Sequence, residues 1–201
     1  MMRWTRNKGI SWFLTGTLLV TCGCGLRSLP TSKNDIEATL AEMTNQYKRR
    51  ADLIPNLVNT VKGYAKHEAS TLEAVVEARS KATSTTIDPS KASAEQIQNF
   101  QAAQGGLSQA LSRLMVVVEK YPDLKADRNF RELQAQLEGT ENRITVARNR
   151  HIEAIKRFND LVSAPPESWT NSLFYHFAKM PQWTVEDAEK KKNEVAPAVE
   201  F

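Results

Sequence analysis

The sequence predicts an all-α protein, an elongated antiparallel up-and-down bundle of three long helices with a short helix near the C-terminus. Two observations support this prediction. Apolar residues recur at alternating spacings of three and four in three separate stretches, as one buried face of a helix requires. The chain also has only 8 Gly and 8 Pro, and 41% of its 201 residues are apolar, enough for one packed domain.

Residues 1–25 have the organisation of an export signal. A basic segment, Met1–Lys8, precedes an apolar run, Gly9–Val20, and small residues follow. The run is short for a membrane span, which needs roughly 20 apolar residues. Both cysteines of the chain come directly after the run, so we expect no disulfide framework in the following domain.

The segment around Cys22 and Cys24 resembles a bacterial lipoprotein signal, and both cysteines are candidates for lipidation. Leu19 stands three residues before Cys22, whereas Gly23 stands directly before Cys24. Several acyl chains on one cysteine would form a stable anchor. An N-terminal helix that stays uncleaved is the alternative. In both cases the basic residues favour a cytoplasmic N-terminus, with the bundle on the non-cytoplasmic side.

The first long helix follows a linker at residues 26–34. Its apolar face extends over Ile36–Ala78, and Pro55 lies inside it. An internal proline removes a backbone hydrogen bond and kinks or ends a helix. Because the apolar spacing keeps its register across Pro55, we expect one helix bent near Ala51–Pro55. Two separate helices are the alternative.

The second helix begins after a polar stretch at residues 83–92, which predicts a loop. Ser93 and Gln96 have the spacing of a capping box, in which each side chain bonds the other residue's backbone. The pair Gly105-Gly106 lies inside this helix. Since each glycine lowers helix stability by about 1 kcal/mol, a close approach of a neighbouring helix is the expected reason for the pair.

The third helix begins at Asp127 or Asn129 and stops before Pro165-Pro166. Ser168 is expected to cap a short helix after it. The aromatic segment Trp169–Trp183 suits docking on the bundle, a membrane surface or a partner, and docking is the default. The bundle domain thus covers residues 35–180, and residues 181–201 form a charged, partly extended tail.

The net charge of +4 does not indicate nucleic-acid binding. Three of the 27 basic residues precede the first apolar run, and the others nearly balance the 23 acidic residues. A protein that binds nucleic acid is expected to have a basic stripe with stacking aromatic residues. We therefore predict no nucleic-acid partner.

Charged residues that interrupt or flank the apolar faces form the candidate site. Arg50 and Glu68 interrupt the first face. They could form a switch or binding patch inside the bundle, or buried ion pairs that set helix register, and we favour the structural interpretation. The complete predicted cluster comprises Arg50, Asp52, Glu68, Arg79, Glu141, Arg143 and Arg148.

The sequence predicts no catalytic centre, metal site or cofactor. The three histidines, His67, His151 and His176, lack the spacing of zinc or di-iron ligands. His151 lies on the third apolar face, where a hydrogen-bonded core residue is expected. Neither a Gly-x-Ser-x-Gly turn nor a Gly-rich phosphate loop occurs, so we predict that the protein is not an enzyme.

Several segments resemble the LemA family in residues, order and spacing. The resemblance covers roughly Ile36–Asp160 and, more weakly, Pro197, Val199 and Phe201 in the tail. It implies an N-terminal membrane segment, a long antiparallel helical bundle and a bacterial envelope location, without a defined activity. The segments that carry it are Arg49–Val58, Thr60–Glu68, Glu77–Arg79, Tyr121–Ala126, Gly139–Ile144 and Ala147-Arg148.

The resemblance also implies a class of partners. Family members are often encoded near membrane zinc metalloproteases, which suggests a scaffold or adaptor for other envelope membrane proteins. The competing hypothesis is a ligand-sensing bundle that binds a small molecule between helices near Gly105-Gly106. The chain departs from the family at Phe158-Asn159, where a Tyr-Asn pair is common, and at Ala164–Ser172, which replaces a shorter Phe-Pro turn.

Overall fold

The computed structural model of the protein describes residues 6–65, 67–89 and 92–181, with side chains from residue 27 onward. This part of the chain is helical and has no strand, which confirms the predicted all-α class. None of its helices combines the length and the apolar character that crossing a membrane requires. The helical elements are α1 (Arg6–Tyr64), α2 (Ala69–Ser84), α3 (Ala94–Val118), α4 (Pro122–Ala126), α5 (Arg128–Ser163), α6 (Glu167–Thr170) and the π-helical turn η1 (Asn171–Tyr175).

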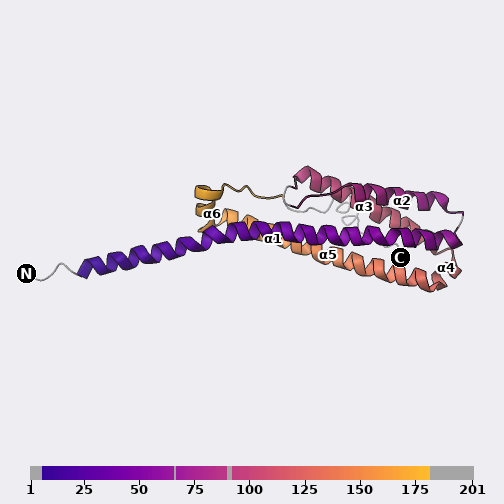
Figure 1. Cartoon of the computed structure of the whole chain (residues 1–201), viewed down its shortest axis with the longest axis horizontal. Coiled ribbons are helices and arrows are strands. Elements are labelled where there is room, and N and C mark those ends of the chain that lie inside the picture. The colour runs from indigo at the N-terminus through magenta and orange to yellow at the C-terminus, as the bar shows by residue number, and fades with distance from the viewer. Residues whose placement is uncertain (1–5, 66, 90–91, 182–201) are drawn as a thin grey trace, which may run out of the picture.

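Helices α1 and α5 lie side by side over a long distance and run in opposite directions (Figure 1). Near one end, the hydroxyl of Tyr64 donates a hydrogen bond to Asp127 Oδ2 at 3.0 Å. Toward the other end, Arg150 Nη1 lies 2.9 Å from Glu42 Oε1. The last residues of α1 therefore meet the first residues of α5.

Helices α2 and α3 form a second pair; α2 packs along the C-terminal half of α1, and α3 reaches α1 through side chains such as Gln104 and Phe100. Arg79 of α2 donates from Nε to the backbone carbonyl of Ala51 in α1 at 2.8 Å. Val75 of α2, Leu107 of α3 and Ile54 of α1 are fully buried in one cluster. This half of the bundle therefore has four packed helices, whereas the other half has mainly α1 and α5.

The first helix passes through Pro55 without a break and ends nine residues later. Helix α1 includes both Pro30 and Pro55 and ends at Tyr64, and the chain then reverses into α2. The prediction of one bent helix through Ala78 was therefore wrong. Each helix buries one face, and the four-residue separation between α1 and α2 preserves the apolar spacing, so periodicity alone did not reveal the reversal. Residues 26–34, predicted as a linker, are also helical and belong to α1.

The predicted capping box is confirmed at the start of α3. Ser93 Oγ accepts a hydrogen bond from the Gln96 backbone N–H at 3.1 Å, and Gln96 Oε1 accepts one from the Ser93 N–H at 2.9 Å. The expected close approach at Gly105-Gly106 is wrong. Both glycines are exposed, and a Cβ built on either would meet no atom within 4 Å. No neighbouring helix therefore packs closely on this pair.

We expect Ser93→Ala to lower the free energy of unfolding by about 1 kcal/mol, because the backbone N–H of Gln96 loses its acceptor, the Ser93 hydroxyl. Urea unfolding followed by circular dichroism measures the change. Ser112→Ala is the matched control, since the exposed Ser112 hydroxyl only bonds the carbonyl of Ser108 in its own helix. Equal effects of the two substitutions would show that the capping box does not stabilise α3.

Three clusters of buried apolar side chains follow one another along the bundle. In order along α1 they contain Leu29, Met43 and Ile54, each fully buried. Helix α5 contributes to all three clusters, whereas α2 and α3 contribute mainly to the cluster around Ile54. The buried Arg50 lies on α1 between the second cluster and the third.

The aromatic segment after α5 is partly docked and partly exposed. Tyr175, Phe177 and Met180 pack against the Leu29 cluster, which confirms the expected docking for this part of the segment. The short helix begins earlier than predicted, because Ser168 lies inside α6 and the cap position is Pro166. Trp183 and the predicted tail from residue 182 lie outside the described residues.

Candidate functional site

The side chain of Arg50 connects three helices inside the bundle. Its residue is 2% exposed. Nη1 donates to Glu141 Oε2 of α5 at 3.0 Å and to Ser108 Oγ of α3 at 2.9 Å. Nη2 donates to Gln104 of α3 twice, to Oε1 at 2.7 Å and to the backbone carbonyl at 3.2 Å. Arg50, Gln104, Ser108 and Glu141 are called the Arg50 cluster below.

Glu141 and Gln104, two of the three acceptor side chains of this cluster, differ in their access to water. The Glu141 side chain is 51% exposed, so its carboxylate lies at the edge of the bundle. Gln104 is buried and held from both sides, because its Nε2 donates to the carbonyl of Ala82 in α2 at 3.3 Å. A buried guanidinium needs several acceptors to offset the loss of water. Neutral oxygens of α3 provide part of that compensation here.

Tyr47 forms a second layer beside the cluster. The Arg50 guanidinium lies over its ring, 5.1 Å from the centroid, and the ring of Phe100 meets it edge-on at 5.2 Å. The Tyr47 hydroxyl accepts a hydrogen bond from Arg148 Nη2 at 3.0 Å. Tyr47 thus fixes two cationic side chains from α1 and α5 while it closes the apolar cluster around Met43.

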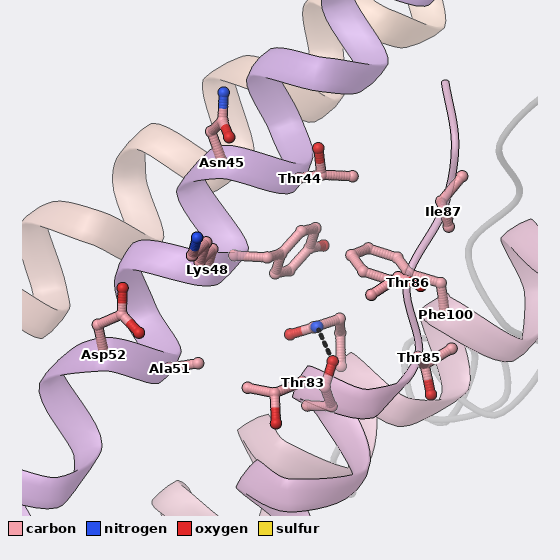
Figure 2. Close-up of a pocket in the computed structure, with 13 residues that line it drawn as sticks. Thr44, Asn45, Lys48, Ala51, Asp52, Thr83, Thr85, Thr86, Ile87 and Phe100 are labelled. Carbon is pink, nitrogen blue, oxygen red and sulfur yellow. Dashed lines mark hydrogen bonds between the residues drawn. The ribbon is translucent and has the colours of Figure 1, made fainter. Parts of the chain in front are cut away.

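An open cavity of about 470 Å³ lies next to this layer (Figure 2). It is bounded by α1, the end of α2, the chain after α2 and the start of α3. Figure 2 shows the extended chain at Thr85–Ile87 opposite Thr44 and Asn45 of α1. We call it the side cavity; its lining residues are Thr44, Asn45, Tyr47, Lys48, Ala51, Asp52, Ala82, Thr83, Thr85, Thr86, Ile87, Phe100 and Gln104.

The side cavity combines an apolar floor with a polar rim. Tyr47, Phe100 and Ile87 contribute the large apolar surfaces, whereas four threonines and Asn45 supply hydroxyl and amide groups. Lys48 and Asp52 are exposed and have no salt bridge to another described residue. Neither histidine nor cysteine occurs among the lining residues. This chemistry suits binding of an amphipathic group or a side chain.

The structure separates the charged residues that the sequence predicted as one cluster. Only Arg50 and Glu141 contact each other. Glu68 Oε1 accepts a hydrogen bond from the Tyr121 hydroxyl at 3.2 Å near the turn between α1 and α2. Arg143 Nη2 donates to Thr140 Oγ1 of its own helix at 3.1 Å. Three further residues lie elsewhere: Asp52 on the cavity rim, Arg79 against the Ala51 carbonyl and Arg148 against Tyr47.

Other members of the site were not selected from the sequence. Gln104 lies on the apolar face of α3, and its polarity at that position was a visible signal. Ser108 and the residues Thr85–Ile87 gave no such signal, because their role depends on how the chain after α2 folds back over α1. The predicted lipidation candidates, Cys22 and Cys24, lie on the α1 backbone, and their side chains are outside the described part.

His151 is a buried core residue, as predicted. It is 1% exposed, and its Nδ1 lies 3.1 Å from Thr39 Oγ1. Burial lowers the pKa of its imidazole, and a hydrogen bond with the backbone of Ile36 opposes that effect in part. Within the described residues no three His, Cys, Asp or Glu side chains gather as metal ligands would.

The lowered pKa of His151 predicts a loss of stability on acidification. The unfolded chain binds a proton near the ordinary pKa of 6.5, whereas the folded chain binds it only at lower pH. The free energy of unfolding is therefore fully retained above this value and falls below it, by up to about 1 kcal/mol per pH unit. Urea unfolding between about pH 7 and pH 5.5 measures the slope. His151→Gln should flatten it, and an unchanged slope would contradict the assignment to His151.

Comparison with known proteins gives one family match. A family model described as LemA family matches residues 39–201. The matched range contains all four residues of the Arg50 cluster and every lining residue of the side cavity. No curated protein matches the chain.

Proposed function

This chain belongs to the LemA family, and we propose that it is a non-catalytic scaffold or adaptor of the bacterial cell envelope. In this proposal an elongated antiparallel up-and-down bundle is anchored to a membrane through its N-terminus and stands on the non-cytoplasmic side. It binds other envelope membrane proteins, and a membrane metalloprotease is one candidate partner. The family relationship supports the helical bundle, and the side cavity supports the binding role.

The observation that carries the proposal is the side cavity. Helices α1 and α3 form one side of it, and Arg50 holds the lining residues Tyr47 and Gln104 in place, so this side of the cavity is preformed. Preformed pockets with an apolar floor and a polar rim accept the anchoring side chains of binding partners. A volume of about 470 Å³ can hold one or two large side chains. We infer that a partner inserts an apolar or aromatic side chain here.

The anchor in this proposal is the N-terminal part of α1. The export-signal organisation of residues 1–25 and the cysteines after the apolar run support a lipid anchor, with an uncleaved helix as the alternative. Incorporation of labelled fatty acid into Cys22→Ser, Cys24→Ser and the double variant distinguishes the two. Label that remains in the double variant would exclude lipidation at these cysteines.

Site-specific cross-linking in intact membranes tests the adaptor function. A photoreactive amino acid at Thr86 lies on the rim of the side cavity, whereas one at Val116 lies on an exposed part of α3 that does not line it. We expect a reproducible protein partner from position 86 and none from position 116. Thr83→Trp, a substitution of an exposed rim residue, should abolish the product. The absence of any reproducible protein partner would contradict the adaptor function.

A small-molecule ligand is the second candidate, because the volume of the side cavity also lies in the range of small-ligand pockets. Such a ligand would lie between α1 and the chain after α2, where the cavity is larger than the hollow of about 250 Å³ that Gly106 lines between α2 and α3, near the location suggested by the sequence. Thermal unfolding in the presence of fractionated envelope extract tests it, since a ligand that binds only the folded chain raises Tm. A shift that Thr83→Trp removes would favour sensing, and a shift that persists would exclude this cavity.

A further inference from the structure

Three large apolar side chains project from the short helix after α5. Trp169, Leu173 and Phe174 are 67%, 72% and 65% exposed. They lie in α6 and η1 within six residues of one another, and we call them the apolar hook. Scattered single apolar residues on a surface are normal, but neighbouring large ones mark a binding surface.

The backbone beneath the apolar hook is held by two asparagines. Asn171 Oδ1 accepts from the Phe177 N–H, and its Nδ2 donates to the Phe177 carbonyl, both at 2.9 Å. Asn159 of α5 binds the backbone of Met180 in the same way: its Oδ1 accepts from the N–H at 2.8 Å, and its Nδ2 donates to the carbonyl at 2.9 Å. Each amide therefore satisfies both backbone groups of one residue. Asn171 ties the following chain to η1, and Asn159 fixes that chain to α5.

Aromatic packing adds to this fixation. The ring of Phe177 stacks on Tyr175 at 5.3 Å and contacts the buried Phe158 at 5.9 Å. Lys33 of α1 lies over the same ring, with Nζ 5.3 Å from its centroid. The segment thus buries some of its aromatic residues and presents others outward from a rigid base.

The apolar hook lies at the end of the bundle from which α1 continues alone (Figure 1). Leu29 of α1 shares a buried cluster with Phe177, which places the two segments at the same level. Along an α-helix, Leu29 is about 14 Å from Val20, the last residue of the apolar run. It is about 8 Å from Cys24. The headgroup layer extends roughly 5–7 Å beyond the hydrocarbon core on each side. A lipid anchor at Cys24 therefore places the hook close to the level of the lipid headgroups, whereas an uncleaved helix ending its apolar run at Val20 places it about 7 Å above them.

We propose that the apolar hook lies in the lipid interface of the membrane that holds the N-terminal anchor. The proposal rests on the lipid anchor proposed above. Trp, Phe and Leu are the side chains that bury their apolar parts at this depth, and Trp also keeps its indole N–H near water. Two attachment points, the anchor and the hook, would then fix the tilt of the bundle relative to the membrane.

Fluorescence quenching by brominated lipids tests the hook in the full-length protein. The chain is purified from membranes and placed in vesicles of phosphatidylethanolamine and phosphatidylglycerol whose acyl chains carry bromine. Trp169 is the only tryptophan left after Phe replaces Trp4, Trp12 and Trp183. We expect its fluorescence to fall severalfold relative to unbrominated vesicles. A matched probe, Val116→Trp with Trp169→Phe, should keep its fluorescence, because Val116 is exposed on α3 in the four-helix half.

Flotation of the same samples separates failure of the hook from failure of the anchor. Protein that floats with vesicles while Trp169 is quenched no more than the probe at position 116 would overturn the hook and leave the anchor intact. Protein that does not float would overturn both. Leu173→Asp with Phe174→Asp should reduce quenching of Trp169 to the control value without affecting flotation, and unchanged quenching would overturn the proposed role of these side chains.

A second copy of the chain is the competing occupant of this surface. Leu173→Cys would then form a disulfide-linked dimer in vesicles under mild oxidation, with Trp169 shielded from bromine. That result would overturn lipid contact in favour of self-association. A monomer with strongly quenched Trp169 supports the lipid interface.

Discussion

Phe158→Ala is expected to lower the free energy of unfolding by about 3–5 kcal/mol, as truncation of a fully buried aromatic side chain does. Phe158 is fully buried and packs with Leu29 and Ile36 of α1 and with Phe177 below the apolar hook. Its truncation removes apolar contacts on three segments and leaves a cavity, because the long helices cannot close around the gap. Urea unfolding monitored by circular dichroism measures the loss.

Trp169→Ala is the matched control for Phe158→Ala. It also removes a large aromatic side chain near the same end of the bundle, but that side chain is mostly exposed. In detergent we expect a change within about 0.5 kcal/mol. If the two substitutions destabilise the protein equally, the distinction between a buried base and an exposed hook is wrong.

Glu141→Gln is expected to lower the free energy of unfolding by about 2–3 kcal/mol, because it leaves the buried Arg50 guanidinium without a carboxylate. This value lies below that for a fully buried pair because the Glu141 side chain is half exposed, so water screens the charge of its carboxylate. Gln104 and Ser108 still accept hydrogen bonds from Arg50 in the variant, but they carry no charge. Chemical unfolding of the two proteins gives the difference.

A double-mutant cycle isolates the Arg50–Glu141 interaction. Arg50→Met combined with Glu141→Gln removes the stranded charge, so the double variant should be more stable than the sum of the two single losses predicts. The control is Glu42→Gln, which breaks the exposed pair with Arg150 and should change stability by less than about 1 kcal/mol. Equal effects of Glu141→Gln and Glu42→Gln would show that burial of Arg50 does not matter.

Much of the fold could be predicted from local chemistry. The helical spacing, the Ser93 capping box and the buried position of His151 all depend on residues close in sequence or on one apolar face. The reversal after Tyr64 could not be predicted in this way. The stretch between α1 and α2 has no Pro, and its spacing fits a continuous helix. The turn is set by the burial of Val75 against α1, which is a long-range contact.

The candidate site was predictable only in part. A charged residue on an apolar face must find partners, so the pairing of Arg50 with an acidic residue of another helix was a reasonable expectation. Arg50 pairs with Glu141 and not with Glu68 because of how α5 lies along α1, which is a long-range property. The side cavity depends on the path of the chain at Thr85–Ile87, for which composition predicts a loop but no direction.

The continuity of α1 has a consequence for the direction in which the side cavity faces. One uninterrupted helix runs from the N-terminal segment to the residues that line the cavity. An α-helix turns by about 100° and advances about 1.5 Å with each residue. With the N-terminal anchor proposed above, the number of residues between anchor and cavity would set the direction in which the cavity faces around the membrane normal as well as its height. A tilt or axial rotation of the N-terminal segment would therefore move the cavity along an arc, because one helix connects the two.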